Sequence, residues 1–302
     1  MHITIRVPAT SANLGPGFDA LGLALDLWNE TVITLAIEHT IQISGEGAEK
    51  LSLGENNLII QSAQKLADCA GKRLPPFHVD CVNKIPLSSG LGSSAAAKLT
   101  GLLAANSLLG KPLSTAEILN LATEMEGHPD NVAAALLGGL VVSTMDDGNV
   151  IAHKIVGPED APLIYVTVVF PEFHLPTQEA RTALPQQVSL KDAVHNISHA
   201  VLVVEAFRNG DLELLGKAMT DTLHQPHRLP LIPGAQASMN AAKAAGASAA
   251  ALSGAGPSVI AFSSTQDPAI GEAMKHTFEE RGLQARIFPL KISNHGAEVQ
   301  IR

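Results

Sequence analysis

Cysteine and aromatic residues are scarce in this sequence of 302 residues, which contains two Cys, one Trp, one Tyr and eight Phe. Cys69 and Cys81 have neither a metal-binding spacing nor the arrangement of a disulfide framework. We expect both to be reduced thiols, which predicts a protein of the cytoplasm.

Basic residues are outnumbered as well. Twenty Lys and Arg stand against 29 Asp and Glu, which gives a net charge of -9. Because no basic cluster is interleaved with aromatic residues, nucleic acid is not an expected partner. This charge does not exclude a nucleotide, since local backbone amides and a metal ion can bind phosphates whatever the distant surface carries.

Long hydrophobic runs are missing too. The longest apolar stretch, residues 244–262, is interrupted by Gly246, Gly254, Gly256 and Pro257, so we expect no membrane-spanning helix. Residues 1–7 alternate like a strand and lack the apolar segment of a signal peptide. Both features again favour a cytoplasmic protein without a membrane partner.

The length and the alternation of patterns predict two α+β domains. A chain of 302 residues exceeds what one hydrophobic core usually supports, and the Gly- and Pro-rich segment 157–162 suggests a boundary. We therefore divide the chain into residues 1–160 and 161–302. Periodicity predicts strands at 2–9, 21–27, 31–37, 40–44, 77–83, 140–145, 150–156, 163–170 and 284–292, two more within 248–262, and helices at 57–70, 94–109, 115–126, 131–137, 190–208, 212–222, 235–245 and 268–281.

The stretch 85–97 is the most informative one, because it combines glycines, serines and the start of a helix. Gly90 and Gly92 would let the backbone approach a ligand closely. The following helix, with Ser93 or Ser94 as its expected N-cap, would direct free N–H groups toward the same point. The pattern predicts an anion-binding loop.

Two common phosphate-loop patterns do not fit. The segment from Gly90 to Ala95 matches the dinucleotide fingerprint, but the first acidic residue after it is Glu117, inside a helical pattern. The Walker pattern requires Gly-Lys-Ser/Thr, and the three Gly-Lys pairs are followed by Arg73, Pro112 and Ala218. The loop therefore belongs to another class of phosphate site.

Three segments together resemble a known superfamily. Residues 86–96 are similar to the phosphate loop of the kinases that include galactokinase, homoserine kinase and mevalonate kinase. Residues 8–19 resemble the first motif of homoserine kinases in particular, and residues 253–258 resemble the third motif of the superfamily. The resemblance implies an N-terminal domain like domain 2 of ribosomal protein S5, a ferredoxin-like C-terminal domain, and an active site in the cleft between them.

The resemblance also implies how ATP and Mg²⁺ would bind. Asn57 would lie near the adenine, although an Asn at this position is equally suited to cap a helix. A helix glutamate, Glu124 with Glu126 as the alternative, would bind Mg²⁺ together with the hydroxyl of Ser93 or Ser94. The phosphates would contact the loop residues Pro86, Leu87, Ser88, Ser89, Gly90, Leu91, Gly92, Ser93, Ser94, Ala95 and Ala96.

Charged residues suggest an amino acid as the phosphoryl acceptor. Asp19 could receive an ammonium group, and Arg181 and Arg228 could receive a carboxylate. Homoserine kinases place matching residues around homoserine, which extends the expected substrate site to Asn13, His128, Asn131, Thr177 and Gly254. The resemblance implies Asn131 and Arg181 as catalytic residues.

Asn131 bears on the mechanism. Several relatives have an Asp base in this part of the site, but an Asn cannot take a proton at neutral pH. The resemblance therefore implies direct in-line transfer without a protein base, although the adjacent Asp130 could be proposed instead. It further implies a possible homodimer.

Two other functions remain open at this point. The chain could phosphorylate another small alcohol of the mevalonate type, or it could be a nucleotide-binding regulator without turnover. The histidines carry less information. His195 and His199 lie one helical turn apart, but no Glu or third ligand accompanies them as in common zinc motifs.

Overall fold

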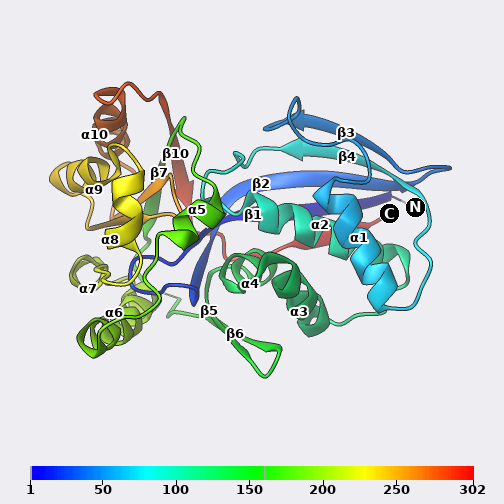
Figure 1. Cartoon of the computed structure of the whole chain (residues 1–302), viewed down its shortest axis with the longest axis horizontal. Coiled ribbons are helices and arrows are strands. Elements are labelled where there is room, and N and C mark those ends of the chain that lie inside the picture. Colours follow the sequence, from blue (N-terminus) through cyan, green and yellow to red (C-terminus); the bar gives the residue numbers. More distant parts are fainter. Residues whose placement is uncertain (1, 160) are drawn as a thin grey trace.

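The computed structural model describes residues 2–159 and 161–302, which contain two β-sheets with helices packed against them (Figure 1). From one edge, the first sheet runs in the order β11, β1, β2, β4, β3, and the hairpin β5–β6 attaches to the start of β2. Its strands are β1 (His2–Ala12), β2 (Leu21–Leu35), β3 (Thr40–Gly45), β4 (Phe77–Asn83), β5 (Leu140–Asp146), β6 (Asn149–Ile155) and β11 (Glu298–Ile301).

Most strand pairs of this sheet are antiparallel, and β3 and β4 form the parallel pair. Parallel neighbours need a crossover connection, and here the helix α1 (Leu58–Cys69) lies between them in the chain. Three more helices, α2 (Ser93–Leu108), α3 (Thr115–Glu126) and α4 (Asp130–Leu137), follow before the hairpin.

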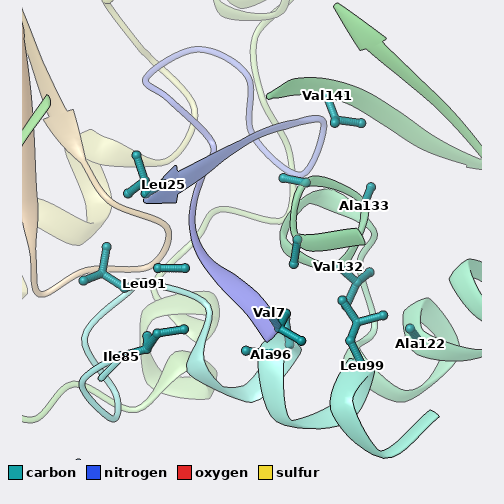
Figure 2. Close-up of a cluster of buried hydrophobic side chains, with 14 of the residues drawn as sticks. Val7, Leu25, Ile85, Leu91, Ala96, Leu99, Ala122, Val132, Ala133 and Val141 are labelled. Atoms are coloured by element: carbon teal, nitrogen blue, oxygen red, sulfur yellow. The ribbon is translucent and has the colours of Figure 1, made fainter. Parts of the chain in front are cut away.

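One face of the first sheet and these helices form a closely packed core. On β1, Ile3, Ile5 and Val7 are fully buried, as the alternation of a strand with one covered face requires. Figure 2 shows Val7 beside Leu99 of α2, with Val132 of α4 nearby. The small residues predominating in these helices allow short separations between backbones.

The second sheet is fully antiparallel, in the order β10, β7, β9, β8. Its strands are β7 (Tyr165–Pro171), β8 (Ala249–Leu252), β9 (Val259–Ser263) and β10 (Ala285–Lys291). Helices α9 (Ala235–Ala244) and α10 (Pro268–Glu279) contact it, and α6 (Leu190–Asn209) and α7 (Leu212–Ala218) contribute to the other buried cluster. This order of strands and helices is ferredoxin-like, as predicted.

The C-terminal segment returns to the first sheet. The last strand, β11, pairs with β1, so that Ile3 lies opposite Ile301 and Ile5 lies opposite Val299. The predicted boundary falls at residue 160, which lies outside the described residues, and the division into 1–160 and 161–302 stays a prediction. Within the described ranges, every helix is too short or too polar to cross a bilayer.

Candidate active site

One cavity brings the three glycine-containing loops together. It has a volume of about 180 Å³ and lies where the ends of β1, α2 and α4 meet the short helices α5 (Thr177–Thr182) and α8 (Gln225–Arg228). Its walls include all eight predicted acceptor residues and much of the phosphate loop: Asn13, Asp19, Ser88, Ser89, Gly90, Gly92, Ser93, Ser94, Glu126, His128, Asp130, Asn131, Thr177, Arg181, Arg228 and Gly254.

The phosphate loop needs its glycines because protein atoms surround them. A Cβ atom on Gly90 would lie 2.2 Å from the carbonyl oxygen of Ser253, and one on Gly92 would lie 2.1 Å from Oγ1 of Thr10. Gly92, with φ of 71°, is itself the N-cap of α2. The prediction of Ser93 or Ser94 as the N-cap was therefore wrong, and both hydroxyls are free of that role.

The serines of this loop have different environments. Ser89 is buried, and its hydroxyl donates to the carbonyl of Pro86 at 2.8 Å and accepts from the N–H of Leu91 at 3.3 Å. Ser89 therefore holds the loop in shape. Ser93 and Ser94 line the cavity at the first turn of α2, where the helix dipole favours an anion.

The third loop is fastened to the other two by hydrogen bonds. The hydroxyl of Ser253 donates to the carbonyl of Gly90 at 2.8 Å, and the N–H of Ser258 donates to the carbonyl of Ser89 at 3.3 Å. The N–H of Gly254 donates to the carbonyl of Ala12 at 3.1 Å. The three loops thus form one connected surface.

Asn13 supports the first loop from within. Its Nδ2 donates to the carbonyl of Gly254 at 2.8 Å, and its Oδ1 accepts from the N–H of Asp19 at 3.0 Å. The side chain is buried, and both Asn13 and Asp19 have positive φ. Asn can adopt this conformation because its side chain forms such local hydrogen bonds.

Asp19 and Arg181 form a two-pronged ion pair at the cavity. Nη1 and Nη2 of Arg181 each donate to one carboxylate oxygen of Asp19 at 2.9 Å. The hydrogen bonds to Asp19 are the main cause that raises the pKa of Arg181. This paired geometry fixes the orientation of both groups.

Arg228 is the largest fully buried side chain in the described part of the protein. Its Nε donates to the carbonyl of Ala180 at 3.2 Å, and its Nη1 donates to that of Gly254 at 3.4 Å. Burial, with Arg181 as a second cause, lowers its pKa to about 10. Since Arg228 has no carboxylate partner among the described residues, an anion entering the cavity would compensate a buried charge.

Phe18 contributes to this arrangement, although the sequence arguments overlooked it. The guanidinium carbon of Arg228 lies 5.1 Å from the centre of its ring, and that of Arg181 lies 5.7 Å away. The ring of His224 stacks on it at 5.3 Å. Its position directly before Asp19 in the first motif was the available signal.

His128, in the turn between α3 and α4, lies close to Asp130 and Asn131, the first two residues of α4. Nδ1 of His128 lies 2.5 Å from Oδ1 of the buried Asp130, which also accepts from the N–H of Asn131 at 2.7 Å. Burial lowers the pKa of His128, but the hydrogen bond and charge of Asp130, with Asp19 and Glu126, raise it overall. Oδ1 of Asn131 accepts from Thr10 at 2.8 Å.

The two candidate metal ligands lie in different places. Glu124 pairs with Lys65 at 2.9 Å, and 64% of its side chain is exposed, away from the cavity. Glu126 lines the cavity, where its Oε2 accepts from the hydroxyl of Ser94 at 3.2 Å and pairs with Lys98. Carboxylate and hydroxyl oxygens suit a hard divalent cation, so the geometry favours Glu126 over Glu124.

A second cavity of about 270 Å³ adjoins the first and shares Ser88, Ser93 and Ser94 with it. Asn57 lies in its wall, but Oδ1 of Asn57 accepts from the N–H of Ile59 at 2.9 Å and its Nδ2 donates to the carbonyl of Ser52 at 2.7 Å. The capping role of Asn57 is therefore present in the structure. Apolar side chains of Ile43, Leu51, Leu58 and Ile59 complete the wall.

His195 and His199 do not form a metal site in the described ranges. Their rings stack with centres 3.8 Å apart, and Nε2 of His195 lies 3.2 Å from the hydroxyl of Thr220. In these ranges, the one group of three possible ligands is Asp19, His128 and Asp130, within the cavity already described.

Comparison with known proteins identifies the class first. The family model described as GHMP kinases N terminal domain matches residues 57–139, and GHMP kinases C terminal matches residues 203–280. The mevalonate kinase of Methanococcus jannaschii has the same fold, with a TM-score of 0.69 over 97% of this chain and 98% of its own, at 20% identity. The chain belongs to the GHMP kinases, which act with ATP and a divalent metal ion.

More similar relatives identify one kind of kinase within this family. A homoserine kinase of Moorella thermoacetica is 45% identical over 98% of this chain and 99% of its own, and one of Carboxydothermus hydrogenoformans is 44% identical over 98% and 96%. The crystal structure of homoserine kinase from Cytophaga hutchinsonii matches with a TM-score of 0.86 and 32% identity, covering 99% and 97%. Within the GHMP kinases, the chain belongs with the homoserine kinases.

Proposed function

We propose that this protein transfers the γ-phosphoryl group of ATP to the side-chain hydroxyl of L-homoserine, giving O-phospho-L-homoserine for threonine synthesis. The observation that carries the proposal is the single cavity in which the phosphate loop faces Asp19, Arg181 and Arg228. A phosphate site and a site for a zwitterion lie in the same space. An amino acid with a side-chain hydroxyl meets both requirements.

The phosphates of ATP would bind the backbone of residues 86–96 and the first turn of α2, with the adenine in the adjoining cavity near Asn57. Mg²⁺ would bind Glu126 and the hydroxyl of Ser93 or Ser94. When bound there, the ion would neutralise charge on the phosphates. This assignment replaces Glu124, whose carboxylate pairs with Lys65 on the surface.

The amino acid would bind through its two charges. Its carboxylate would complement the buried guanidinium of Arg228, and its ammonium group would contact Asp19. Hydrogen bonds with Asn13 and the carbonyl of Gly254 fix the positions of Asp19 and Arg228. Thr177 and His128 border the same space. The hydroxyl would then lie near Asn131.

Transfer would proceed in line without a protein base. Asn131 would orient the hydroxyl, and Arg181 would balance charge on the transferring group, so that positioning and electrostatics supply the catalysis. Asp130 is a poor candidate for a base because its Oδ1 already accepts from His128 and from the N–H of Asn131.

An acceptor panel tests the substrate. ADP release should require L-homoserine and should be weak with mevalonate and other isoprenoid alcohols. Activity with mevalonate-type acceptors alone would contradict the proposal and would support a different small-alcohol kinase.

Arg181→Ala separates a kinase from a nucleotide-binding regulator. The variant should lose turnover by about 10²-fold or more while it keeps its fold and its affinity for ATP, because Arg181 acts on the transferring group and not on the nucleotide pocket. Circular dichroism and ATP titration provide the controls. Unchanged turnover would remove Arg181 from the mechanism, and no turnover in the wild type would favour the regulator.

We also expect the enzyme to work in the cytoplasm and to form a homodimer. Two unpaired thiols support the first expectation, and the resemblance to homoserine kinases supports the second. Cell fractionation and the molecular mass in solution test them.

A further inference from the structure

His224 is a fully buried titratable side chain that has no part in the transfer described above. It directly precedes α8, and Arg228 is the last residue of that helix. Nε2 of His224 lies 2.8 Å from the carbonyl oxygen of Gly15 in the first loop, and its Nδ1 lies 3.4 Å from Nη1 of Arg228. The imidazole therefore joins an active-site loop to the buried cation.

These two contacts determine which ring nitrogen carries the proton. A carbonyl oxygen can only accept, so Nε2 must donate to Gly15. A guanidinium can only donate, so Nδ1 must accept from Arg228. One neutral tautomer meets both conditions. Burial lowers the pKa of His224, although the nearby carboxylate of Asp221 raises it in part, and a neutral ring is therefore expected at neutral pH.

The imidazole is held in place by groups other than Arg228. Oδ2 of Asp221 accepts from the backbone N–H of His224 at 3.0 Å and from that of Gln225 at 2.6 Å, and the same oxygen lies 3.4 Å from Nε2 of His224. Oδ1 of Asp221 accepts from Nδ2 of Asn196 on α6 at 2.7 Å. The ring of Phe18 stacks on the imidazole with centres 5.3 Å apart. These contacts fix both the position and the plane of the ring.

In the described ranges, the hydrogen-bond acceptors of Arg228 are all uncharged. Its Nε donates to the carbonyl of Ala180, and its Nη1 donates to the carbonyl of Gly254 and to Nδ1 of His224. Nη2 has no hydrogen-bond partner among the described residues, and the guanidinium borders the cavity. Uncharged acceptors orient the guanidinium but leave its positive charge for a ligand.

We propose that His224 is a positioning residue, whose Nδ1 holds the guanidinium of Arg228 so that Nη2 meets the carboxylate of the amino acid. The inference rests on the proposed function, in which Arg228 receives that carboxylate. A carboxylate in place of the imidazole would also orient Arg228, but it would offset the charge that attracts the substrate. Arg181, whose charge is paired with Asp19, shows that case in the same cavity.

Two substitutions separate the contacts of His224. In His224→Asn, the amide oxygen can take the place of Nδ1 and accept from Arg228, whereas in His224→Gln, the amide nitrogen can take the place of Nε2 and donate to Gly15. His224→Gln should raise the KM for L-homoserine about tenfold or more, because a hydrogen bond to a charged group is lost, and His224→Asn should raise it much less. The KM for ATP should change less than about twofold in both variants, since Arg228 acts on the amino acid.

A substrate without a carboxylate tests whether the effect passes through Arg228. Propanolamine with a terminal hydroxyl has the hydroxyl and ammonium groups of homoserine but lacks its carboxylate. His224→Gln should lower kcat/KM about tenfold for L-homoserine and less than about twofold for propanolamine, whereas a general distortion of the site would lower both equally. The matched control is His227→Gln on the same helix, whose side chain is not part of the cavity wall and which should keep both wild-type values.

The failure of this inference is distinguishable from that of the proposed function. A wild type that does not convert L-homoserine would overturn the proposed function and this inference with it. With an active wild type, a KM for L-homoserine that rises more in His224→Asn than in His224→Gln would assign the role of His224 to its contact with Gly15. That result, an unchanged KM in His224→Gln, or equal losses with both acceptors would each overturn the inference alone.

Discussion

The end of α3 shows how a displacement of two residues decides which side chain reaches the cavity. Glu124 and Glu126 are both near the phosphate loop in sequence, but only the latter lines the cavity. Two residues along a helix turn the side chain by about 200°, which moves it from the site to the surface. The family pattern could not choose between them because the length of this segment varies.

The first prediction follows from that placement. Glu126→Gln should lower kcat by about 10²-fold and raise the Mg²⁺ concentration needed for half-maximal activity, because a carboxylate ligand is lost. Glu124→Gln, a matched change on the same helix, should stay within about twofold of the wild type. Magnesium titrations of both variants measure these effects. A large loss in Glu124→Gln with little change in Glu126→Gln would assign the metal-binding role to Glu124.

The pair of His128 and Asp130 makes stability depend on pH. The folded-state pKa of His128 is raised above 6.5 by Asp130, Asp19 and Glu126, which outweigh its burial. The charged pair therefore contributes its full stability below about pH 6.5 and loses it as the pH rises through the folded-state pKa.

His128→Gln should accordingly lower Tm most at low pH. We expect a deficit of about 3 °C or more at about pH 6 that shrinks toward about pH 9, since a hydrogen bond between charged groups contributes about 1.5–3 kcal/mol. Thermal melting across this range measures it, with His153→Gln on β6 as the exposed control. A deficit that is constant or grows with pH would contradict the assignment.

At the scale of elements, periodic segments were predicted well and short segments were not. The helix Thr115–Glu126 agrees to the residue, because its capping box and apolar spacing are local signals. Residues 21–27 and 31–37 were expected as two strands, but β2 is continuous from Leu21 to Leu35. The helices α5 and α8, with six and four residues, are held by tertiary contacts and carry no periodic signal.

The glycine loops depend on how closely elements approach one another. Gly90 and Gly110 share a φ of 79°, but a Cβ on Gly90 would lie 2.2 Å from the carbonyl oxygen of Ser253, and one on Gly110 has no atom within 4 Å. The two positions therefore separate the cost of positive φ from the cost of a clash.

Gly90→Ala should displace the phosphate loop and raise the KM for ATP at least about tenfold. Gly110→Ala should lose only about 1–2 kcal/mol of stability, the usual cost of a left-handed conformation, and keep its KM. Steady-state kinetics and melting curves measure the two effects. Equal KM values in the two variants would show that the contact with Ser253 is unimportant.

At the scale of the molecule, the sequence motifs were sufficient for the family and the two-domain α+β fold, and both are confirmed. They also named most residues that line the cavity, including Asn13, Asp19 and Arg228. They could not show that Asp19 already pairs with Arg181, or that Phe18 lies beside both guanidiniums, because such contacts join segments more than 160 residues apart.

The return of β11 to the first sheet links the two ends of the chain. β11 covers the edge of β1, whose N–H and C=O groups would otherwise be unpaired along residues 3–6. No local pattern predicted this strand, because it has four residues and follows a loop.

Deletion of residues 298–302 should therefore destabilise the whole molecule and not only its C-terminal half. We expect Tm to fall by at least about 5 °C and aggregation to increase, because β1 becomes an exposed edge beside the active-site loops. Scanning calorimetry and light scattering of the truncated and full chains measure this. Replacing Gln300 by Glu keeps the strand and serves as the control. If truncation left Tm unchanged, residues 1–160 would fold without β11, and the predicted domain boundary would gain support.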